Sequence, residues 1–290
     1  MIARPRALRS PHTGEDFYFV QQMRGASGTA LGVADGVGGW ILSGVDPSKF
    51  SQALMYHCAR YASFSWAGEP PSDPIDGDGV TGDVVEGWET TPLECLELAY
   101  SAVQRERLVD AGSSTATVLT LNAHNGLLRA ANLGDSGFII LRSGSVLYHQ
   151  APQTHSFNFP RQLSKWPLSM SDRAPHRISD TPRAADAYST SLRTGDIIVL
   201  FTDGISDNVF DVEVQSVATL ASRTIASART DEARTAQAIA DRLVEYAVGC
   251  MWNKDRVSPF ERNAARSGVP WSGGKPDDAT AVVAIVSEGM

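Results

Sequence analysis

The sequence predicts an α+β protein in which helices cover two stacked antiparallel sheets. Helical patterns come as blocks between groups of strand patterns, whereas a doubly wound parallel fold would need helices and single strands to alternate. In addition, Asn125-Gly126 stands between two β-like runs, which is a strong signal for an antiparallel hairpin. The 290 residues are enough for a substantial core, and we expect one domain over 1–290.

The strand patterns are short and apolar. The first, Leu31 to Ala34, ends at Asp35 and a glycine-rich turn. Residues 115–149 predict an antiparallel meander, because the run after the Asn-Gly hairpin leads into a second hairpin turn at 142–145. The later strand patterns are 115–133, 137–150, 196–204 and 278–287.

Helical patterns occupy roughly 48–64, 92–109, 211–227 and 231–248. In the last of these, five apolar residues fall on one face at helical spacing: Ala236, Ile239, Ala240, Leu243 and Ala247. The three cysteines lie far apart in helix-like segments and show no metal-ligand or paired spacing. We therefore expect Cys58, Cys95 and Cys250 to be structural thiols of a protein in a reducing compartment.

The charge is unevenly spread along the chain. Residues 61–104 hold nine acids and no Lys or Arg, so removing them from the formal net charge of −8 leaves the rest near neutral. We expect no nucleic-acid partner, because phosphate backbones need clustered Lys and Arg. Residues 65–91, rich in Pro, Gly and acid, predict an acidic surface insertion, with a contact site for basic partners as the alternative.

The ends and the hydropathy of the chain add two expectations. Residues 1–12 form a short basic arm, which is either the tail of a removed presequence or simply a surface arm. No run of eighteen or so apolar residues occurs, so we expect no membrane span.

Acidic residues stand at the ends of five strand-like runs, and several precede a glycine. They are Glu15 and Asp16, Asp35, Asp135, Asp203 with Asp207, and Asp277 with Asp278. A single Asp-Gly is ordinarily only a turn. Because the strand ends of a packed sheet are neighbours, however, these acids are expected to converge on one cleft, where bound cations would relieve their repulsion. Ligand sets made only of oxygen select Mg²⁺ or Mn²⁺.

Such a centre predicts hydrolysis of a phosphate ester. Two divalent ions can activate water and hold a phosphate for in-line attack, so no Ser, Cys or His nucleophile is needed. Consistently, the sequence has no nucleophile elbow, Cys-x5-Arg loop or Walker-type glycine loop. In this arrangement Asp35 bridges the ions, and the bare backbone of Gly36 lets its carbonyl approach them.

The acidic motifs, taken in order, resemble those of the metal-dependent Ser/Thr protein phosphatases of type 2C. They are "GED", "VADGVGGW", "ANLGDSG", "LFTDGISDNV" and "PDDAT", and they run from Glu15 to Thr280. Three further stretches, "QTHSFNFPRQLS", "VSPFERNAARSG" and "GGKPDDAT", are similar to a small branch whose known members are largely mitochondrial. The resemblance implies a four-layer αββα sandwich, a centre of two or more Mn²⁺ or Mg²⁺ ions, and phosphorylated proteins as substrates.

The resemblance also implies roles for individual residues. Asp35 is similar to the bridging ligand, with the Gly36 carbonyl beside it, and Asp203 and Asp277 match ligands from the later strands. These three aspartates are the expected catalytic residues. The other matches are Asp16 with Glu15 in the first motif, Asp135 and Asp207 at an additional, weaker metal site, and Ser136 and Asp278 in supporting roles.

Two positions depart from the family pattern. Val37 stands where many members have a histidine that protonates the leaving alcohol, and Pro11 stands where many have an arginine that holds the phosphate. His12 and Arg9 are candidate substitutes, with a flexible arm as the alternative. His155 belongs to the branch signature and is either catalytic or a packing residue that stabilises a turn.

These departures leave two rivals to a protein phosphatase open. One is a binding protein that keeps the fold without turnover, which the retained cluster of costly carboxylates opposes. The other is a metal-dependent hydrolase for small phosphate esters or anhydrides. We expect a monomeric phosphatase of the mitochondrial matrix that acts on phosphoproteins, with the cytoplasm as the alternative location.

Overall fold

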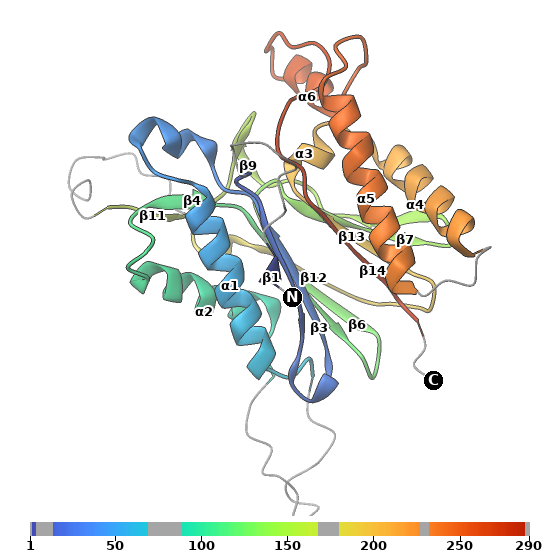
Figure 1. Ribbon diagram of the computed structural model, residues 1–290. Helices are drawn as coiled ribbons and strands as arrows, with labels where there is room; N and C mark the ends of the chain where they lie inside the picture. The colour runs from blue at the N-terminus through green and yellow to red at the C-terminus, as the bar shows by residue number, and fades with distance from the viewer. Residues whose placement is uncertain (1, 4–13, 69–88, 168–179, 227–231, 288–290) are drawn as a thin grey trace, which may run out of the picture.

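The computed structural model describes residues 2–3, 14–68, 89–167, 180–226 and 232–287 (Figure 1). Two antiparallel sheets form its centre. The larger sheet has the strand order β1 (Ile2–Ala3), β2 (Phe17–Gln22), β3 (Gly28–Ala34), β5 (Ala116–Asn122), β6 (Leu127–Leu133) and β12 (Asp186–Ser191). The smaller sheet has the order β14 (Ala281–Ile285), β13 (Ile197–Phe201), β7 (Gly137–Arg142) and β8 (Ser145–His149). Two short pairs join β11 (Leu163–Lys165) to β4 (Gly112–Ser114) and β10 (Phe159–Pro160) to β9 (Thr154–Ser156).

Helices cover the outer face of each sheet (Figure 1). The larger sheet carries α1 (Ser48–Phe64) and α2 (Pro92–Arg105), and the smaller sheet carries α4 (Asp211–Ala226) and α5 (Glu232–Met251). The shorter helices are η1 (Arg24–Ala26), η2 (Gly38–Ser43), η4 (Pro182–Ala184), α3 (Asp203–Ser206) and α6 (Pro259–Arg266). Apolar cores fill all three interfaces between the four layers. The αββα sandwich predicted from the sequence is therefore confirmed.

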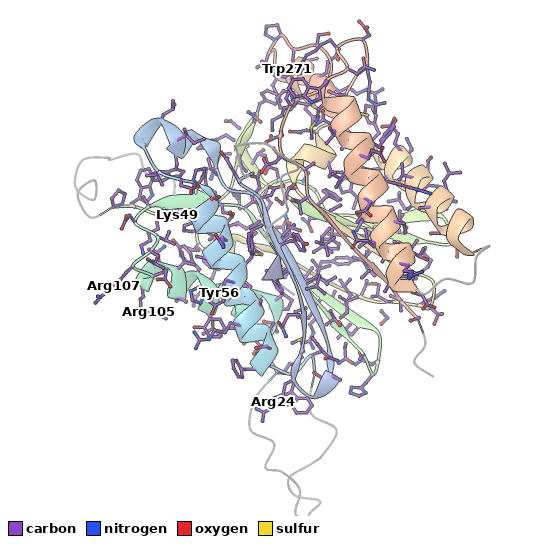
Figure 2. The ribbon with its side chains drawn as sticks, viewed as in Figure 1. Arg24, Lys49, Tyr56, Arg105, Arg107 and Trp271 are labelled. Atoms are coloured by element: carbon purple, nitrogen blue, oxygen red, sulfur yellow. The ribbon has the colours of Figure 1, made fainter. Side chains whose placement is uncertain are left out.

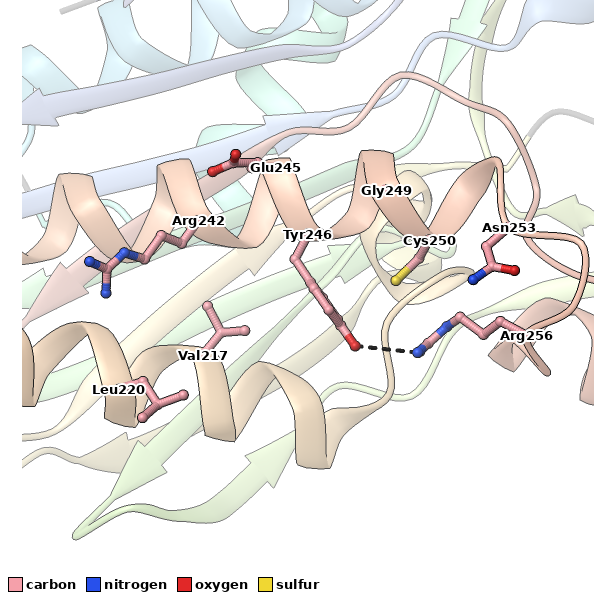
Figure 3. Close-up of a pocket in the computed structure, with 9 residues that line it drawn as sticks. All are labelled: Val217, Leu220, Arg242, Glu245, Tyr246, Gly249, Cys250, Asn253 and Arg256. Atoms are coloured by element: carbon pink, nitrogen blue, oxygen red, sulfur yellow. Dashed lines mark hydrogen bonds between the residues drawn. The ribbon is translucent and has the colours of Figure 1, made fainter.

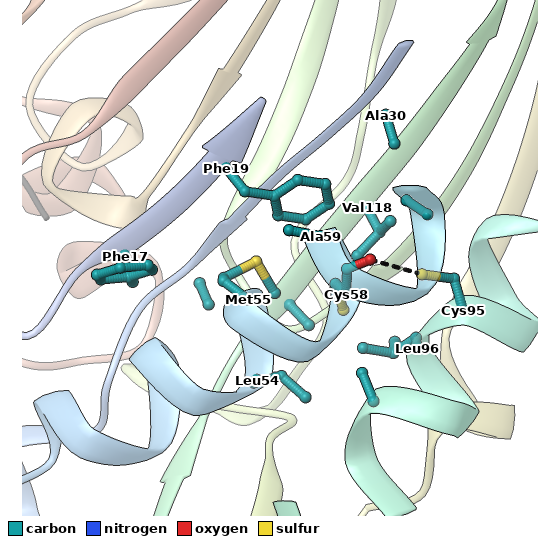
Figure 4. Close-up of a cluster of buried hydrophobic side chains, with 14 of the residues drawn as sticks. Phe17, Phe19, Ala30, Leu54, Met55, Cys58, Ala59, Cys95, Leu96 and Val118 are labelled. Atoms are coloured by element: carbon teal, nitrogen blue, oxygen red, sulfur yellow. Dashed lines mark hydrogen bonds between the residues drawn. The ribbon is translucent and has the colours of Figure 1, made fainter. Parts of the chain in front are cut away.

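The core beneath α1 holds two of the cysteines. Leu54, Met55 and Cys58 of α1 are fully buried together with Phe19 of β2 (Figure 4). The Cys95 thiol, on α2, donates a hydrogen bond to the Cys58 carbonyl at 3.4 Å. All three cysteines are buried and none forms a disulfide, as expected for structural thiols. Burying each large apolar side chain stabilises the fold by about 1.5–3 kcal/mol, which fixes α1 and α2 on the sheet.

Helix α2 ends earlier than its sequence pattern predicts. The pattern predicts a helix over 92–109, but the helix ends at Arg105. The Lys165 ammonium, which comes from β11, donates hydrogen bonds to the Val103 carbonyl at 3.0 Å and the Glu106 carbonyl at 2.6 Å. A cation on the last carbonyls satisfies acceptors that the helix itself leaves free. This contact comes from a distant strand, so the local pattern does not contain it.

The predicted meander over 115–149 is divided between the two sheets. Its first hairpin, β5 with β6, belongs to the larger sheet, and its second, β7 with β8, belongs to the smaller one. The second turn has Ser143 and Gly144 at φ 50° and 72°, which is suited to a two-residue hairpin. Both hairpins are confirmed, but β6 and β7 do not pair. The chain crosses between the sheets at the segment that contains Asp135.

Several elements were not predicted from the sequence, among them β12 and α6. Strand β12 is a polar edge strand that pairs with β6, and its Tyr188 stacks on Tyr148 of β8 with ring centroids 3.7 Å apart. Helix α6 begins at Pro259 and is capped by Ser258, whose hydroxyl accepts the Glu261 N–H at 3.0 Å. The Ser-Pro-x-Glu run is a helix-start signal, so α6 was recognisable in the sequence.

The remaining helix predictions agree with the structure. Helix α1 spans the predicted residues, and α4 and α5 begin within one residue of their predicted starts. On α5, four of the five apolar residues assigned to one face are buried, and Ala236 is half-buried. Among the described helices, none combines the length and the hydropathy that a bilayer crossing requires.

Candidate metal centre

Acidic side chains from both sheets meet at one end of the sandwich. The carboxylates of Asp16, Asp35 and Asp278 offer oxygens within 4.8 Å of one another, and so do those of Asp35, Asp135 and Asp203. Asp35 belongs to both groups. Each of these aspartates stands just before or just after a strand, so the sandwich brings together positions that lie far apart in the sequence.

Thr115 holds the backbone of Asp35 at the end of β3. Its N–H donates to Thr115 Oγ1 at 3.0 Å, and its carbonyl accepts the Thr115 N–H at 3.0 Å. The Thr115 hydroxyl also shares a 2.7 Å hydrogen bond with Ser136, which neighbours Asp135. Through this hydrogen bond, Ser136 connects the end of β3, where Asp35 lies, to the segment between β6 and β7, where Asp135 lies.

Glycine is needed beside two of these acids because other backbone comes close. A Cβ on Gly36 would lie 2.8 Å from the Pro47 carbonyl oxygen and 2.9 Å from that of Glu15. A Cβ on Gly204 would lie 1.8 Å from the Asp278 carbonyl oxygen. Neither glycine has a positive φ. The reason for the glycine at 36 is thus close approach rather than a left-handed turn.

Asp16 is anchored by a buried threonine at the end of β13. Thr202 Oγ1 donates to Asp16 Oδ2 at 2.7 Å and accepts the Thr280 N–H at 3.1 Å. The carboxylate of Asp278 accepts the backbone N–H groups of Glu15 at 2.5 Å and Asp16 at 2.9 Å. The first and last acidic motifs are therefore joined directly, although more than 260 residues separate them.

A lysine lies among the acids on the other side of Asp203. The Lys275 ammonium is 2.6 Å from Asp203 Oδ2, 2.8 Å from Asp207 Oδ2 and 3.1 Å from Asp277 Oδ2. The short helix α3 presents Asp203 and Asp207 one turn apart, on the same side. Burial alone would lower the pKa of Lys275, but the three carboxylates together raise it. The lysine is therefore charged.

Crowding makes the acids around Asp203 bind protons more tightly than free carboxyl groups do. Burial, followed by the charge of Asp203, raises the pKa of Asp207 and of Asp277 to about 7. Burial and then the charges of Asp203 and Asp207 raise the pKa of Asp135 to about 8. Like charges forced together in a desolvated site have this effect unless cations compensate them.

The acids on the Asp16 side behave in the same way. Burial raises the pKa of Glu15 to about 7, with smaller contributions from Asp278 and Asp46. Burial followed by nearby carboxylates raises the pKa of Asp16 and of Asp35 well above the ordinary value. The whole cluster therefore has an excess of negative charge that the described side chains do not neutralise.

Unsatisfied oxygens show that the cluster fits divalent cations. Asp16 Oδ1 and Asp135 Oδ1 are buried and have no hydrogen-bond partner among the described residues. A buried carboxylate oxygen without a donor is costly, unless a cation binds there. Asp16 and Asp135 each belong to one of the two groups that share Asp35. Carboxylates alone, without His or Cys, are the donors that Mg²⁺ and Mn²⁺ prefer.

The predicted site residues are thus distributed over one continuous cluster. Four of them, Asp16, Asp35, Asp135 and Asp203, lie in the two groups of carboxylates. Asp207 and Asp277 join the cluster through Lys275, and the Glu15 carboxylate lies beside Gly38, at the edge. Sequence reasoning underrated Asp278 and did not identify Lys275 or Thr202. Lys275 does lie in the stretch "GGKPDDAT", directly before the last acidic motif, and Thr202 lies in "LFTDGISDNV".

The described histidines do not supply the missing proton donor. His155 shares a 2.8 Å hydrogen bond with Asp180, which also accepts the Gln162 N–H, so it stabilises the turn around β9. His57 pairs with Glu106, directly after α2, His149 pairs with Asp211 of α4, and none of the described histidines contacts the cluster. Val37 uses its backbone N–H to bond the Ser113 carbonyl. The candidates Arg9 and His12, like Pro11, lie outside the described residues.

A groove between α4 and α5 lies elsewhere in the structure. It has a volume of about 620 Å³, and its lining includes Val217 and Leu220 from α4 with Tyr246 from α5 (Figure 3). Arg256 closes one end, where its guanidinium donates to the Tyr246 hydroxyl at 3.3 Å and pairs with Glu213. None of the clustered acids lines this groove. Its ion pair joins α4 to the segment that follows α5, the Tyr246 hydroxyl donates from α5 to Glu213 at 2.8 Å, and neither contact has a part in the metal centre.

Comparison with known proteins places the chain in a family. Residues 84–256 match the family described as stage II sporulation protein E (SpoIIE). The human protein phosphatase PTC7 homolog is 36% identical over 276 residues, which cover 95% of this chain and 80% of that protein. The 5-azacytidine resistance protein azr1 of Schizosaccharomyces pombe is 32% identical over 282 residues, covering 97% and 85%.

Solved structures agree with the sequence relatives. The X-ray structure of the photosystem II phosphatase PBCP is 29% identical, with a TM-score of 0.69, and the match covers 95% of this chain and 92% of that one. The catalytic domain of the Ser/Thr phosphatase PstP, solved with two manganese ions, is 21% identical with a TM-score of 0.52, covering 99% and 96%, and shares the fold. This chain therefore belongs to the PP2C/SpoIIE-type protein phosphatase family, in the branch of the PTC7 homologs.

Proposed function

We propose that this protein is a metal-dependent phosphatase that hydrolyses phosphoserine and phosphothreonine in proteins, using two divalent cations, Mn²⁺ or Mg²⁺. The observation that carries the proposal is that Asp35 is shared by two groups of three carboxylates. A buried oxygen without a hydrogen-bond partner, on Asp16 in one group and on Asp135 in the other, supports a cation position in each. Membership of a protein phosphatase family supports the substrate class.

We assign each carboxylate by its place in the cluster. Asp35 would hold both ions, with Asp16 and Asp278 as the other ligands of one and Asp135 and Asp203 as the other ligands of the second. The remaining proposed ligands are Gly36, through its carbonyl, Asp277 beside Asp203, and Glu15 at the edge, whereas the Asp207 carboxylate contacts Lys275.

The reaction is direct transfer of the phosphoryl group to water. Two bound divalent cations would lower the pKa of water and polarise the phosphate. The water oxygen bonds to phosphorus, the bond from phosphorus to the serine or threonine oxygen breaks, and inorganic phosphate leaves. Asp16 is held in place by Thr202, so its carboxylate is oriented before substrate arrives. Cys58 and Cys95 are buried in the core beneath α1, and Cys250 is buried beside the groove between α4 and α5, where none of the clustered acids lies, so none of the cysteines forms a phosphoenzyme.

Val37 determines how the leaving oxygen gains its proton. A valine has no proton to give, and no described histidine contacts the cluster. We propose that solvent protonates the leaving oxygen. A positioned side-chain acid contributes about 10²–10⁴ in rate at such sites, so this enzyme is expected to be slower than relatives with a histidine at this position.

The cellular setting is proposed on the branch resemblance. We propose a monomer of one domain that acts on phosphoproteins in the mitochondrial matrix, because the known members of the resembling branch are largely mitochondrial. The basic residues at 1–12 and most of the acidic insertion at 65–91 lie outside the described residues.

The test is phosphate release from a phosphothreonine peptide with Mn²⁺, with Mg²⁺ and with chelator. Asp35→Asn removes the charge shared by both groups and is expected to lower metal-dependent turnover by more than about a hundredfold. The matched control is Asp241→Asn, on the exposed face of α5, where the carboxylate only accepts a hydrogen bond from Gln237. This variant is expected to keep wild-type turnover.

Three outcomes would contradict the proposal. Turnover that survives Asp35→Asn would remove the metal centre from the reaction. Manganese binding without any turnover would identify a binding protein that keeps the fold. Faster turnover of nucleotides or sugar phosphates than of phosphopeptides would change the substrate class.

A further inference from the structure

The acidic cluster already contains one cation of its own. The Lys275 ammonium contacts Asp203, Asp207 and Asp277, and only 14% of the lysine side chain is exposed. Asp203 therefore lies between two positively charged positions. One is the cation position that it shares with Asp35 and Asp135, and the other is the lysine.

The backbone of Lys275 is fixed by a fully buried amide. Asn208 Oδ1 accepts the Lys275 N–H at 2.8 Å, and Asn208 Nδ2 donates to the Lys275 carbonyl at 2.9 Å. The same Nδ2 donates to the Gly204 carbonyl at 3.0 Å, within α3. The loop of Lys275 and the helix that carries Asp203 and Asp207 are therefore held together independently of the ion pairs.

Aromatic residues hold the lysine side chain from the side of α6. The ammonium lies 5.3 Å from the centre of the Phe260 ring, within the range of a cation–π contact. Phe260 in turn contacts Trp271, with ring centroids 4.9 Å apart. The packing leaves the lysine little freedom, in contrast to a surface side chain that bends toward the nearest acid. The structure therefore builds a fixed cation position.

We propose that Lys275 is a resident cation of the centre, occupying the place that a further divalent ion would need between Asp203 and Asp207. The inference rests on the proposed metal centre and limits that centre to two ions. A divalent ion needs several oxygens in contact, and here the ammonium already takes one oxygen each from Asp203, Asp207 and Asp277. The ammonium is covalently attached, so this position stays occupied at every metal concentration.

The test counts Mn²⁺ ions bound at equilibrium by titration calorimetry and by electron paramagnetic resonance of free Mn²⁺. The full chain is compared with Lys275→Met, which removes the charge, and Lys275→Arg, which keeps it. Lys49→Met, on α1, is the control for a lysine away from the cluster (Figure 2). We expect two ions in the wild type, in Lys275→Arg and in Lys49→Met. In Lys275→Met we expect a third ion to bind. Its affinity should be about tenfold or more above the weakest affinity at which a third ion would be detected in the wild type.

Each other outcome overturns a distinct part of the argument. Three ions in the wild type, or an unchanged count and unchanged affinities in Lys275→Met, would overturn the role of Lys275 and leave the metal centre standing. A wild-type chain that binds no Mn²⁺ would overturn the centre itself and the lysine's role with it. If Lys275→Met does not fold, the number of Mn²⁺ ions bound by the wild type still tests the proposal. A third ion bound beside Lys275 in the wild type would contradict it.

Discussion

Thr202 is the residue on which the orientation of Asp16 depends. Its buried hydroxyl donates to the Asp16 carboxylate and accepts the Thr280 N–H. One side chain therefore connects the ends of β13 and β14 to the start of β2. The other oxygen of Asp16 has no partner among the described residues, so the hydroxyl fixes which oxygen faces the proposed cation.

Replacing Thr202 by valine tests this positioning role. Thr202→Val keeps the shape of the side chain and removes both hydrogen bonds, so the free energy of unfolding should fall by about 1–3 kcal/mol. The affinity for Mn²⁺ should fall by about 10–100-fold, as for other residues that orient metal ligands. Thr120→Val, at a buried position within β5, is the control and should leave Mn²⁺ affinity unchanged. Equal Mn²⁺ affinity in Thr202→Val and wild type would contradict the role.

The sequence identifies acids more readily than the residues that hold them. Asp35 and Asp203 are recognisable because an apolar run ends at each and a glycine follows. Thr202 and Lys275 carry no such local signal. Lys275 meets Asp203 across 72 residues of sequence, through a loop whose path depends on Asn208. Such contacts form only when residues far apart in the sequence pack together, so the local pattern of residue types does not predict them.

At the scale of elements, pairing between neighbours is predictable and the choice of sheet is not. Both hairpins within 115–149 follow from local turn signals. Those signals are alike, so they do not reveal that β5 and β6 join one sheet while β7 and β8 join the other. The change of sheet is what places Asp135 in the centre. The polar edge strand β12 was missed for a related reason, because its partner β6 supplies the pairing that its own residues do not signal.

At the scale of the whole molecule, the sandwich concentrates negative charge that its unfolded chain would disperse. The acids come from the ends of β2, β3, β13 and β14 and from the crossing between β6 and β7. In the folded protein, burial and mutual repulsion raise the pKa of Glu15, Asp207 and Asp277 to about 7 and that of Asp135 to about 8. In the unfolded chain these groups would titrate near pH 4.

This difference predicts how the stability of the metal-free protein depends on pH. Between about pH 4 and pH 8 the folded state keeps protons that the unfolded state has released, so stability falls as the pH rises. The melting temperature in chelator should therefore be lower at pH 8 than at pH 6, by on the order of 5 °C. Asp135→Asn, which removes one of the titrating groups, should reduce that difference.

Manganese should reverse the trend, because the cation displaces the bound protons. The stabilisation that Mn²⁺ provides, measured as the rise in melting temperature, should be larger at pH 8 than at pH 6. If the melting temperature of the metal-free protein rises from pH 6 to pH 8, the pKa values of these carboxyl groups are not raised by folding, which would contradict the prediction.

The most direct test of the metal centre is anomalous X-ray scattering at the manganese absorption edge, from crystals grown with Mn²⁺. We expect two peaks, one among Asp16, Asp35 and Asp278 and one among Asp35, Asp135 and Asp203, with Asp35 in contact with both. No peak is predicted between Asp203 and Asp207, where Lys275 lies. Peaks only outside these two groups, or no peak at saturating Mn²⁺, would contradict the central claim.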